Sequence, residues 1–272
     1  MTARSTESVA AVTPRAAATT LIVRDAHDGL EVLMVRRSLQ ASFMPGAYVF
    51  PGGAVDAADA WPAAQALCDE RSEDLANRIG SVTEVGDQAQ AFAVAALREC
   101  FEECGLWLGV DEPLPTSVGG LPKLRARLHA GESIAGLAEA AGLLLHTRGL
   151  HPWSHWVTPV GLPKRFDTLF FVVRAPAGQV AEVDAGETTT LAWVNPDTAL
   201  QAHSRGEFPM EFATVSTVQS LQSFARGRVA TLLAHAADLR HLPPLHPRLK
   251  LDGEDRIKGV LLPGQPGYDQ AA

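Results

Sequence analysis

RECFEECGL, at residues 98–106, puts three glutamates into one short segment of a predicted helix. With about 100° between successive residues of an α-helix, Glu99, Glu102 and Glu103 share one face, and Arg98 lies beside Glu102. Like charges at this spacing repel each other by about 0.2–0.5 kcal/mol per pair. Two interpretations stay open on the helix alone. The face is either a site for Mg²⁺ or Mn²⁺, which prefer carboxylate oxygens, or an ordinary solvated acidic surface.

The opposite side of the same segment is apolar and follows the i, i+3, i+4, i+7 spacing of a helix packed on a core. Its members are Ala93, Leu97, Cys100, Phe101 and Cys104. We therefore expect a helix that begins near Asp87, a suitable N-cap, and ends at Gly105, which suits the position just past a C-terminus.

A glycine-rich turn precedes this helix. Gly53, five further residues and Asp59, followed by residues 98–106, resemble the two parts of the Nudix box, the signature of hydrolases that split nucleoside diphosphates linked to another group. Asp59 stands where the box normally has glutamate. The gap from Asp59 to Arg98 is longer than in the usual box, so an insertion splits the motif.

Three other segments resemble one Nudix branch, the peroxisomal-type coenzyme A and acyl-coenzyme A diphosphatases, which carry an insertion at this place. They are FMPGAYVFPGGAVDAAD at residues 43–59, WSHWVTP at 153–159 and RFDT at 165–168. The resemblance implies an α/β fold of the Nudix type. We expect an α/β/α sandwich with a mixed sheet, an insertion before the box helix and a C-terminal helical extension, and the alternation of strand-like and helix-like segments agrees with it.

The resemblance also implies a mechanism, the metal-assisted attack of water on a pyrophosphate. Glu99, Glu102 and Glu103 would hold one or more Mg²⁺ or Mn²⁺ ions, which neutralise charge and lower the pKa of a bound water. Arg98, among the catalytic residues of the box, is expected to orient a carboxylate rather than to react.

Nudix enzymes often take a further metal ligand or general base from a later loop. Here that loop carries Glu182, Asp184 and Glu187. Glu187 and Glu182 are the candidates for a base, because a carboxylate that binds metal is a weak base. The alternative is that acids in an exposed loop only keep the chain soluble.

Several polar residues are candidates for substrate binding. Arg37 and Ser38 end a predicted strand where the coenzyme A branch has a similar pair, and an Arg there can bind phosphate with two hydrogen bonds or remain a plain surface residue. Gly52 and Gly53 can bring backbone close to a ligand.

Arg165 and Asp167 begin another predicted strand. They either point towards a ligand or pin the strand end to a neighbour.

Composition limits the partners and the setting. The chain has 272 residues, of which 46% are apolar, and its net charge is −8. The acidic balance argues against general binding to nucleic acid or anionic membranes. The partner that the resemblance implies is a small-molecule nucleotide substrate. Cys68, Cys100 and Cys104 fit neither a zinc motif nor a disulfide framework and are expected to be core thiols.

The sequence shows no apolar run long enough to cross a bilayer, no signal-peptide core, and no peroxisomal address at residues 268–272. We therefore expect a soluble cytoplasmic protein.

One Nudix hydrolase domain is expected at residues 15–240, after a disordered tail at 1–14 and before a C-terminal extension at 241–272. The insertion covers residues 60–86 and is predicted to hold one helix at 62–79. After the box helix we predict a short strand at 106–110 and two short helices, with Ser133 near the cap of the second.

These patterns together predict a metal-dependent Nudix pyrophosphohydrolase, with coenzyme A or acyl-coenzyme A as its expected substrate. Cleavage would give 3′-phosphoadenosine 5′-phosphate and a phosphopantetheine product. Two alternatives remain, a hydrolase of another nucleoside diphosphate derivative such as NADH or an ADP-sugar, and a non-catalytic Nudix-fold ligand sensor. A homodimer is a common arrangement in the family.

Overall fold

The computed structural model describes residues 12–40, 44–109, 119–184, 188–254 and 256–271. In this part of the chain seven strands form one mixed sheet, in which β3, β2, β1, β6 and β5 are neighbours in that order, β4 pairs with β1, and β7 pairs with β2. Their bounds are β1 (Arg15–Ala26), β2 (Gly29–Arg37), β3 (Tyr48–Val49), β4 (Gly52–Ala54), β5 (His151–Val157), β6 (Phe166–Arg174) and β7 (Thr188–Val194).

Strand β1 lies at the centre of the sheet. It forms a tight antiparallel hairpin with β2, in which Ala26 pairs with Gly29. The sequence Asp28-Gly29 is typical of hairpin turns, and Gly29 adopts a φ of +124° that glycine allows. On its other side β1 runs parallel to β6. Strand β4 also pairs with β1, with Gly52 opposite Thr19. The glycine-rich turn predicted at Gly52 and Gly53 is therefore wrong, because pairing with β1 makes these residues the start of a short strand.

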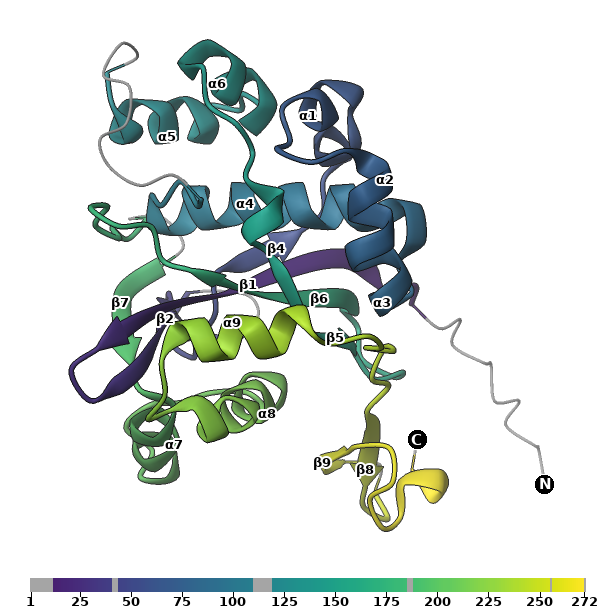
Figure 1. The fold of residues 1–272 in the computed structure, drawn as a ribbon. Helices are drawn as coiled ribbons and strands as arrows, with labels where there is room; N and C mark the ends of the chain where they lie inside the picture. Colours follow the sequence, from purple (N-terminus) through teal and green to yellow (C-terminus); the bar gives the residue numbers. More distant parts are fainter. Residues whose placement is uncertain (1–11, 41–43, 110–118, 185–187, 255, 272) are drawn as a thin grey trace.

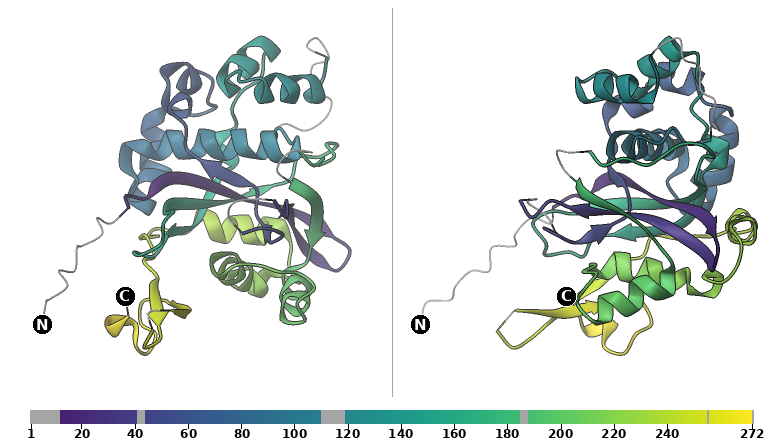
Figure 2. Two further views of the ribbon diagram at one scale, coloured as in Figure 1. Left: turned by 180° about the vertical axis from the view of Figure 1, so that it is seen from behind. Right: turned by 90° about the vertical axis from the view of Figure 1, so that its left-hand side faces the viewer.

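Helices cover both faces of this sheet (Figures 1 and 2). The box helix α4 lies on one face, together with the insertion helices and α5 and α6, whereas α7, α8 and α9 cover the other face. The bounds are α1 (Pro62–Ala66), α2 (Ser72–Leu75), α3 (Ser81–Thr83), α4 (Ala89–Cys104), α5 (Leu121–His129), α6 (Ile134–Ala141), α7 (Pro196–Ser204), α8 (Phe212–Ser220) and α9 (Val229–Ala237). The predicted α/β/α sandwich with a mixed sheet is confirmed.

Each face has its own apolar core because successive side chains of a strand point to opposite sides. Ala18 and Ile22 of β1 pack into the cluster that includes α4. Leu21 and Val23 pack into the cluster beneath α7–α9, where Trp153 and Trp156 of β5 are also buried. A small hairpin, β8 (Arg248–Leu251) and β9 (Ile257–Leu261), follows the last helix and projects from the body of the fold (Figure 1).

The insertion differs from the single helix predicted at residues 62–79. It contains α1, then a bent segment with an isolated bridge from Cys68 to Leu145, then α2, a π-helical turn at Ala76–Gly80, and α3. The break occurs because Leu67 and Asp69 form backbone hydrogen bonds with Leu145, of 2.8 and 3.1 Å. A strand-like pairing with a distant segment therefore overrides local helix propensity.

Two smaller predictions around the box helix were also wrong. Asp87 is not the N-cap, because a 3-10 turn at Gly86–Gln88 leads into α4. Residues 106–109 form no strand, because the backbone N–H and carbonyl of Trp107 pair with the side chain of Gln179 instead. The C-terminal prediction is confirmed, since Gly105 follows α4 with a φ of +69° and donates its N–H to the carbonyl of Phe101.

Cys100 and Cys104 are buried and unpaired, as predicted, and burial raises the pKa of both thiols. Cys68 is half-buried, and burial raises its pKa to about 12. No helix among the described residues is long and apolar enough to span a membrane.

Candidate active site

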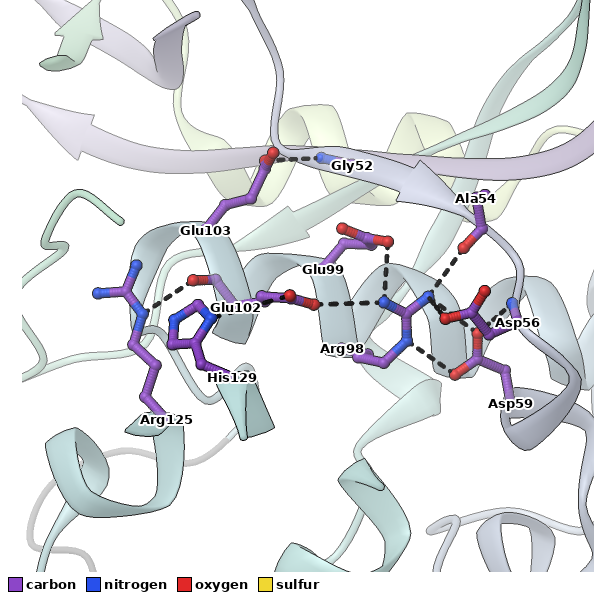
Figure 3. A network of polar contacts seen from close by, with 10 residues as sticks. All are labelled: Gly52, Ala54, Asp56, Asp59, Arg98, Glu99, Glu102, Glu103, Arg125 and His129. Atoms are coloured by element: carbon purple, nitrogen blue, oxygen red, sulfur yellow. Dashed lines mark hydrogen bonds and ion pairs between the residues drawn. The ribbon is translucent and has the colours of Figure 1, made fainter. Parts of the chain in front are cut away.

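Gly52 and Gly53, at the start of β4, lie directly against two glutamates of α4 (Figure 3). The Gly52 N–H donates a 3.0 Å hydrogen bond to Oε2 of Glu103. A Cβ added at Gly53 would lie 2.6 Å from Cδ of Glu99, and one added at Gly52 would lie 2.7 Å from Cα of Thr19. At Gly52 the backbone of β1 leaves no room for a side chain, whereas at Gly53 a Cβ would have to displace the Glu99 carboxylate. Gly53 therefore allows the backbone to approach that carboxylate closely.

Arg98 joins the two halves of the split box. Its Nε and Nη2 each donate to a different oxygen of Asp59, both at 3.0 Å, in the bidentate geometry that gives strong ion pairs. Asp59 is fully buried, and its Oδ2 also accepts the N–H of Asp56. Asp59 therefore fixes the guanidinium, although an insertion separates the two residues in the chain.

The same guanidinium contacts the acids of the helix. Arg98 Nη1 lies 2.8 Å from Oε1 of Glu99 and 3.4 Å from Oε2 of Glu102, and Nη2 donates to the carbonyl of Ala54 at 2.8 Å. Glu103 is buried, whereas Glu99 and Glu102 are partly buried. Arg98 thus contacts three carboxylates of the box, and its role in orienting them stays a prediction.

The acidity of Glu99 is strongly perturbed. Burial raises its pKa to about 7, against the opposing effect of the Arg98 charge, and the nearby negative charge of Glu102 raises it further. A carboxylate in such surroundings gains most from a cation that replaces its lost hydration.

The predicted loop acids approach the same end of α4. The N–H groups of Glu182 and Asp184 donate to the carbonyls of Cys104 and Glu103, at 2.9 and 3.2 Å. The Glu182 side chain is exposed. Glu187, the first candidate for a base, lies outside the described residues.

One residue near these acids was missed by sequence reasoning. His129, the last residue of α5, has Nδ1 3.9 Å from Oε1 of Glu102 and Nε2 3.8 Å from Oδ1 of Asp184. Its only sequence signal is the spacing of four residues from Arg125, which puts both side chains on one face of a helix.

The predicted substrate-binding residues fall into two groups. Arg37 pairs with Thr188 at the start of β7, so it lies on the strand beside the segment that carries Asp184. Ser38 follows it, and its hydroxyl accepts the N–H of Gln40.

Arg165 and Asp167 are engaged elsewhere. Arg165 donates to the carbonyls of Thr158 and Val12, and Asp167 pairs with the buried ring of His155. These contacts support the structural alternative, in which both residues pin the start of β6.

The residues at the start of β4 fit a hard divalent cation. Glu99 and Glu103 bring carboxylate oxygens to the same backbone segment, and oxygen is the donor that Mg²⁺ and Mn²⁺ prefer. Among the described residues, however, no three His, Cys, Asp or Glu side chains converge as a ready-made metal centre. Arg98 instead neutralises Glu99 and Glu102 in the structure.

Known proteins with similar sequences and structures place this geometry in a family. The family described as the NUDT19 Nudix domain matches residues 4–218. An acyl-coenzyme A diphosphatase NUDT19 from Xenopus laevis is 28% identical over 63% of this chain and 54% of its own length. The Homo sapiens protein of the same description is 26% identical over 86% of this chain and 76% of its own length.

The chain thus spans about half the length of the Xenopus relative. A crystal structure of a Nudix hydrolase from Alicyclobacillus acidocaldarius superposes with a TM-score of 0.68 at 29% identity, covering 82% of this chain and 96% of the other. Because the family match covers most of the sequence and this fold likeness agrees with it, the chain belongs to the Nudix hydrolase family, in the branch described by the NUDT19 Nudix domain.

Proposed function

We propose that this chain is a divalent-metal-dependent pyrophosphohydrolase that cleaves coenzyme A or acyl-coenzyme A at the internal pyrophosphate. The observation that carries the proposal is the contact of Glu99 and Glu103 with the Gly52–Gly53 segment of β4, next to the Asp59–Arg98 pair. Family membership supports the reaction class. The Xenopus and human relatives, both described as acyl-coenzyme A diphosphatases, support the substrate.

The box residues divide the work of the site. Glu99 and Glu103, with Glu102 beside them, would hold the ion, which when bound offsets phosphate charge and acidifies a bound water. The Gly52 N–H orients Glu103, and Asp59 orients Arg98, whose Nη1 positions Glu99 and Glu102.

The chemistry itself is a substitution at phosphorus. The water oxygen forms a bond to one phosphorus, and the bond from that phosphorus to the bridging oxygen breaks. The proton of the water passes to a carboxylate, for which Glu187 remains the proposed acceptor. Arg37 and Ser38 remain the proposed phosphate contacts at the end of β2.

The test is product analysis with purified full chain and Mg²⁺ or Mn²⁺. The substrate panel is coenzyme A, acetyl-coenzyme A, NADH, ADP-ribose and ADP-glucose, each compared with a Glu103→Gln variant. Release of 3′-phosphoadenosine 5′-phosphate that disappears in the variant is the expected result.

Other outcomes redirect the proposal. Cleavage of NADH or an ADP-sugar in place of coenzyme A would keep the chemistry and change the substrate. Binding of a panel member without turnover would exclude the hydrolase and support a ligand sensor. A cytoplasmic location, a homodimer and the limits of the domain at 15 and 240 stay predictions.

A further inference from the structure

The C-terminal end of α4 is closed by partners from two other parts of the chain. The last four carbonyls of a helix have no partner within it. Here the carbonyl of Phe101 accepts a hydrogen bond from the N–H of Gly105. The carbonyls of Glu103 and Cys104 accept hydrogen bonds from the N–H groups of Asp184 and Glu182. The carbonyl of Glu102 is satisfied differently, by a 2.8 Å hydrogen bond from Nε of Arg125 on α5 (Figure 3).

Arg125 binds the loop segment as well as the helix. Its Nη1 donates to the carbonyl of Val183 at 3.3 Å, between the two loop residues whose N–H groups bind α4. The side chain is 91% buried, and Gly105 leaves room for it, since a Cβ there would lie 3.3 Å from Nη1. Residues 182–184 are therefore a strap across the end of the box helix, and Arg125 fastens the strap to Glu102.

One helical turn later, α5 reaches the same two elements through their side chains. His129 lies 3.9 Å from the carboxylate of Glu102 and 3.8 Å from that of Asp184, longer than direct hydrogen bonds but within ion-pair range. Figure 3 shows Arg125 and His129 approaching Glu102 from the same helix. A single face of α5 thus contacts the backbone and the acids of both elements.

We propose that α5 is a positioning element of the active site, in which Arg125 and His129 set the distance between Glu102 on the box helix and Asp184 on the strap. This inference rests on the proposed function. In it, α5 acts through the metal-binding acids and does not touch the reacting atoms. A fixed Asp184 would keep a carboxylate at the open end of the acidic face that Glu99, Glu102 and Glu103 form.

Helix capping alone is a weak explanation for Arg125. A smaller donor could satisfy the Glu102 carbonyl, whereas a buried guanidinium brings five donors that need partners. Its Nη2 is buried and has no hydrogen-bond partner among the described residues. An unsatisfied buried donor costs stability. Stability alone therefore does not explain an Arg at this position, and we attribute Arg125 to the positioning of the C-terminal end of α4.

The experiment measures Mn²⁺ binding directly, by the loss of the electron paramagnetic resonance signal of free Mn²⁺ on titration with full chain. Arg125→Met should weaken Mn²⁺ binding and lower kcat by about 10- to 100-fold, the range for loss of an outer-shell partner, while KM changes less. Arg125→Lys should recover part of both, because Lys can still donate to one carbonyl. His129→Gln tests the second contact and disturbs the buried backbone least.

The matched control is Arg127→Met on the same helix. Arg127 is 41% exposed and pairs with Glu132, away from the strap. The Arg127→Met variant should have the Mn²⁺ affinity and the kcat of the wild type. A purely structural role for Arg125 would lower the melting temperature without changing Mn²⁺ affinity well below that temperature.

The outcomes separate the two proposals. If the wild type binds Mn²⁺ and Glu103→Gln does not, but Arg125→Met, Arg125→Lys and His129→Gln all bind like the wild type, the role of α5 is overturned and the hydrolase stands. If Arg125→Met does not fold, the Mn²⁺ affinities of Arg125→Lys and His129→Gln test the role of α5 instead. If the wild type and Glu103→Gln bind Mn²⁺ equally weakly, the proposed function fails, and the role of α5 fails with it.

Discussion

The two faces of the sheet share the same strands but bury different chemistry. Among the described residues, the buried charged side chains all lie on the box-helix side. They are Asp59, Glu70, Arg98, Glu103 and Arg125. On the α7–α9 side the buried polar residues of the helices are Thr214 and Thr217, and the Thr217 hydroxyl bonds within its own helix.

This difference separates function from stability. Burying an ion pair seldom adds net stability, but removing one partner is expensive. The α7–α9 face is an ordinary apolar core with aromatic edge contacts, such as that between Phe50 and Phe170. Substitutions on the box-helix face should therefore change activity as well as stability, whereas those on the other face should leave activity unchanged.

The largest contrast is expected between Asp59→Ala and Leu232→Ala. Asp59→Ala leaves the buried Arg98 without its bidentate partner and should destabilise the fold by about 3–5 kcal/mol. Leu232→Ala opens a cavity under α9 and should cost about 2–5 kcal/mol. Urea unfolding measures both, and only Asp59→Ala should also lose hydrolysis at a temperature where it is folded.

A second substitution distinguishes charge from volume. Arg98→Met added to Asp59→Ala should restore part of the lost stability, because the uncompensated charge is gone, but the double variant should stay inactive. If the double variant were no more stable than Asp59→Ala, the buried charge would not be the cause of the loss.

The same glycine substitution can be made on each face. Gly53→Ala pushes the Glu99 carboxylate away from β4, and a displacement of about 1 Å at a reacting site can cost about 10²-fold in rate. Gly29→Ala forces a side chain into a φ of +124° against the backbone at Ala225 and Arg226, and should cost about 1–3 kcal/mol of stability.

Turnover rates and urea unfolding of both variants distinguish the effect on catalysis from the effect on stability. Gly53→Ala should lose mainly kcat, because the Glu99 side chain can move, and Gly29→Ala should keep the wild-type rate below its melting temperature. Equal activity in Gly53→Ala and the wild type would mean that Gly53 does not set the position of Glu99.

Local patterns predicted the elements of this fold well. The apolar stripe and Gly105 predict α4, the Asp-Gly turn predicts the β1–β2 hairpin, and Ser133 caps α6 by accepting the N–H of Gly136. Each depends on residues within a turn or two of one another. The Nudix box itself could be identified because the spacing within each of its two parts, and most of its residue types, survive the insertion.

Distant contacts could not be predicted in the same way. Leu145 breaks the insertion helix, Gln179 replaces the predicted strand at Trp107, and α5 brings Arg125 and His129 to the box helix. In each case the partners are far apart in the chain, and no local pattern marks the pairing. The role of Asp59 was open for the same reason, since only the fold brings it to Arg98.

The acidity of Glu99 gives a contrast that pH can test in metal-free protein. Its pKa is about 7 in the folded chain and 4.5 in the unfolded reference, so the folded state binds more protons between these values. Stability must then fall as pH rises through this window, and the loss is complete above pH 7. Glu99→Gln removes the ionisable carboxyl group and with it this loss of stability. The variant should be more stable than the wild type by about 1–3 kcal/mol at pH 8 and as stable as the wild type below pH 4.5.

Urea unfolding in the presence of EDTA at pH 4, 6 and 8 measures this difference. Saturating Mn²⁺ should reverse its sign at pH 8, because the ion stabilises the wild type more than the variant. If the wild type were as stable as Glu99→Gln at pH 8 without metal, burial of the ionised Glu99 carboxylate would cost no stability, and the prediction would be wrong.

The smallest effect belongs to the other face, where Asp25 joins the end of β1 to α9. Its Oδ1 accepts the Val229 N–H at 2.9 Å, and Oδ2 lies 3.2 Å from Arg174. The hydrogen bond from Val229, followed by that from Arg174, lowers the pKa of Asp25 below 3.8. Its contribution is therefore fully present above pH 3.8 and is lost as pH falls through the lowered pKa.

Asp25→Asn keeps an acceptor for Val229 but removes the charge at the start of α9, and should cost about 0.5–1 kcal/mol at pH 7 with no change in turnover. The same urea series extended to pH 2 should show this difference shrinking in acid, where Asp25 is neutral. The difference due to Glu99 has the opposite sign and appears near neutrality. Because the two carboxylates differ in burial and in partners, a coincidence of their pH windows would mean that charge is not divided between the faces as the structure indicates.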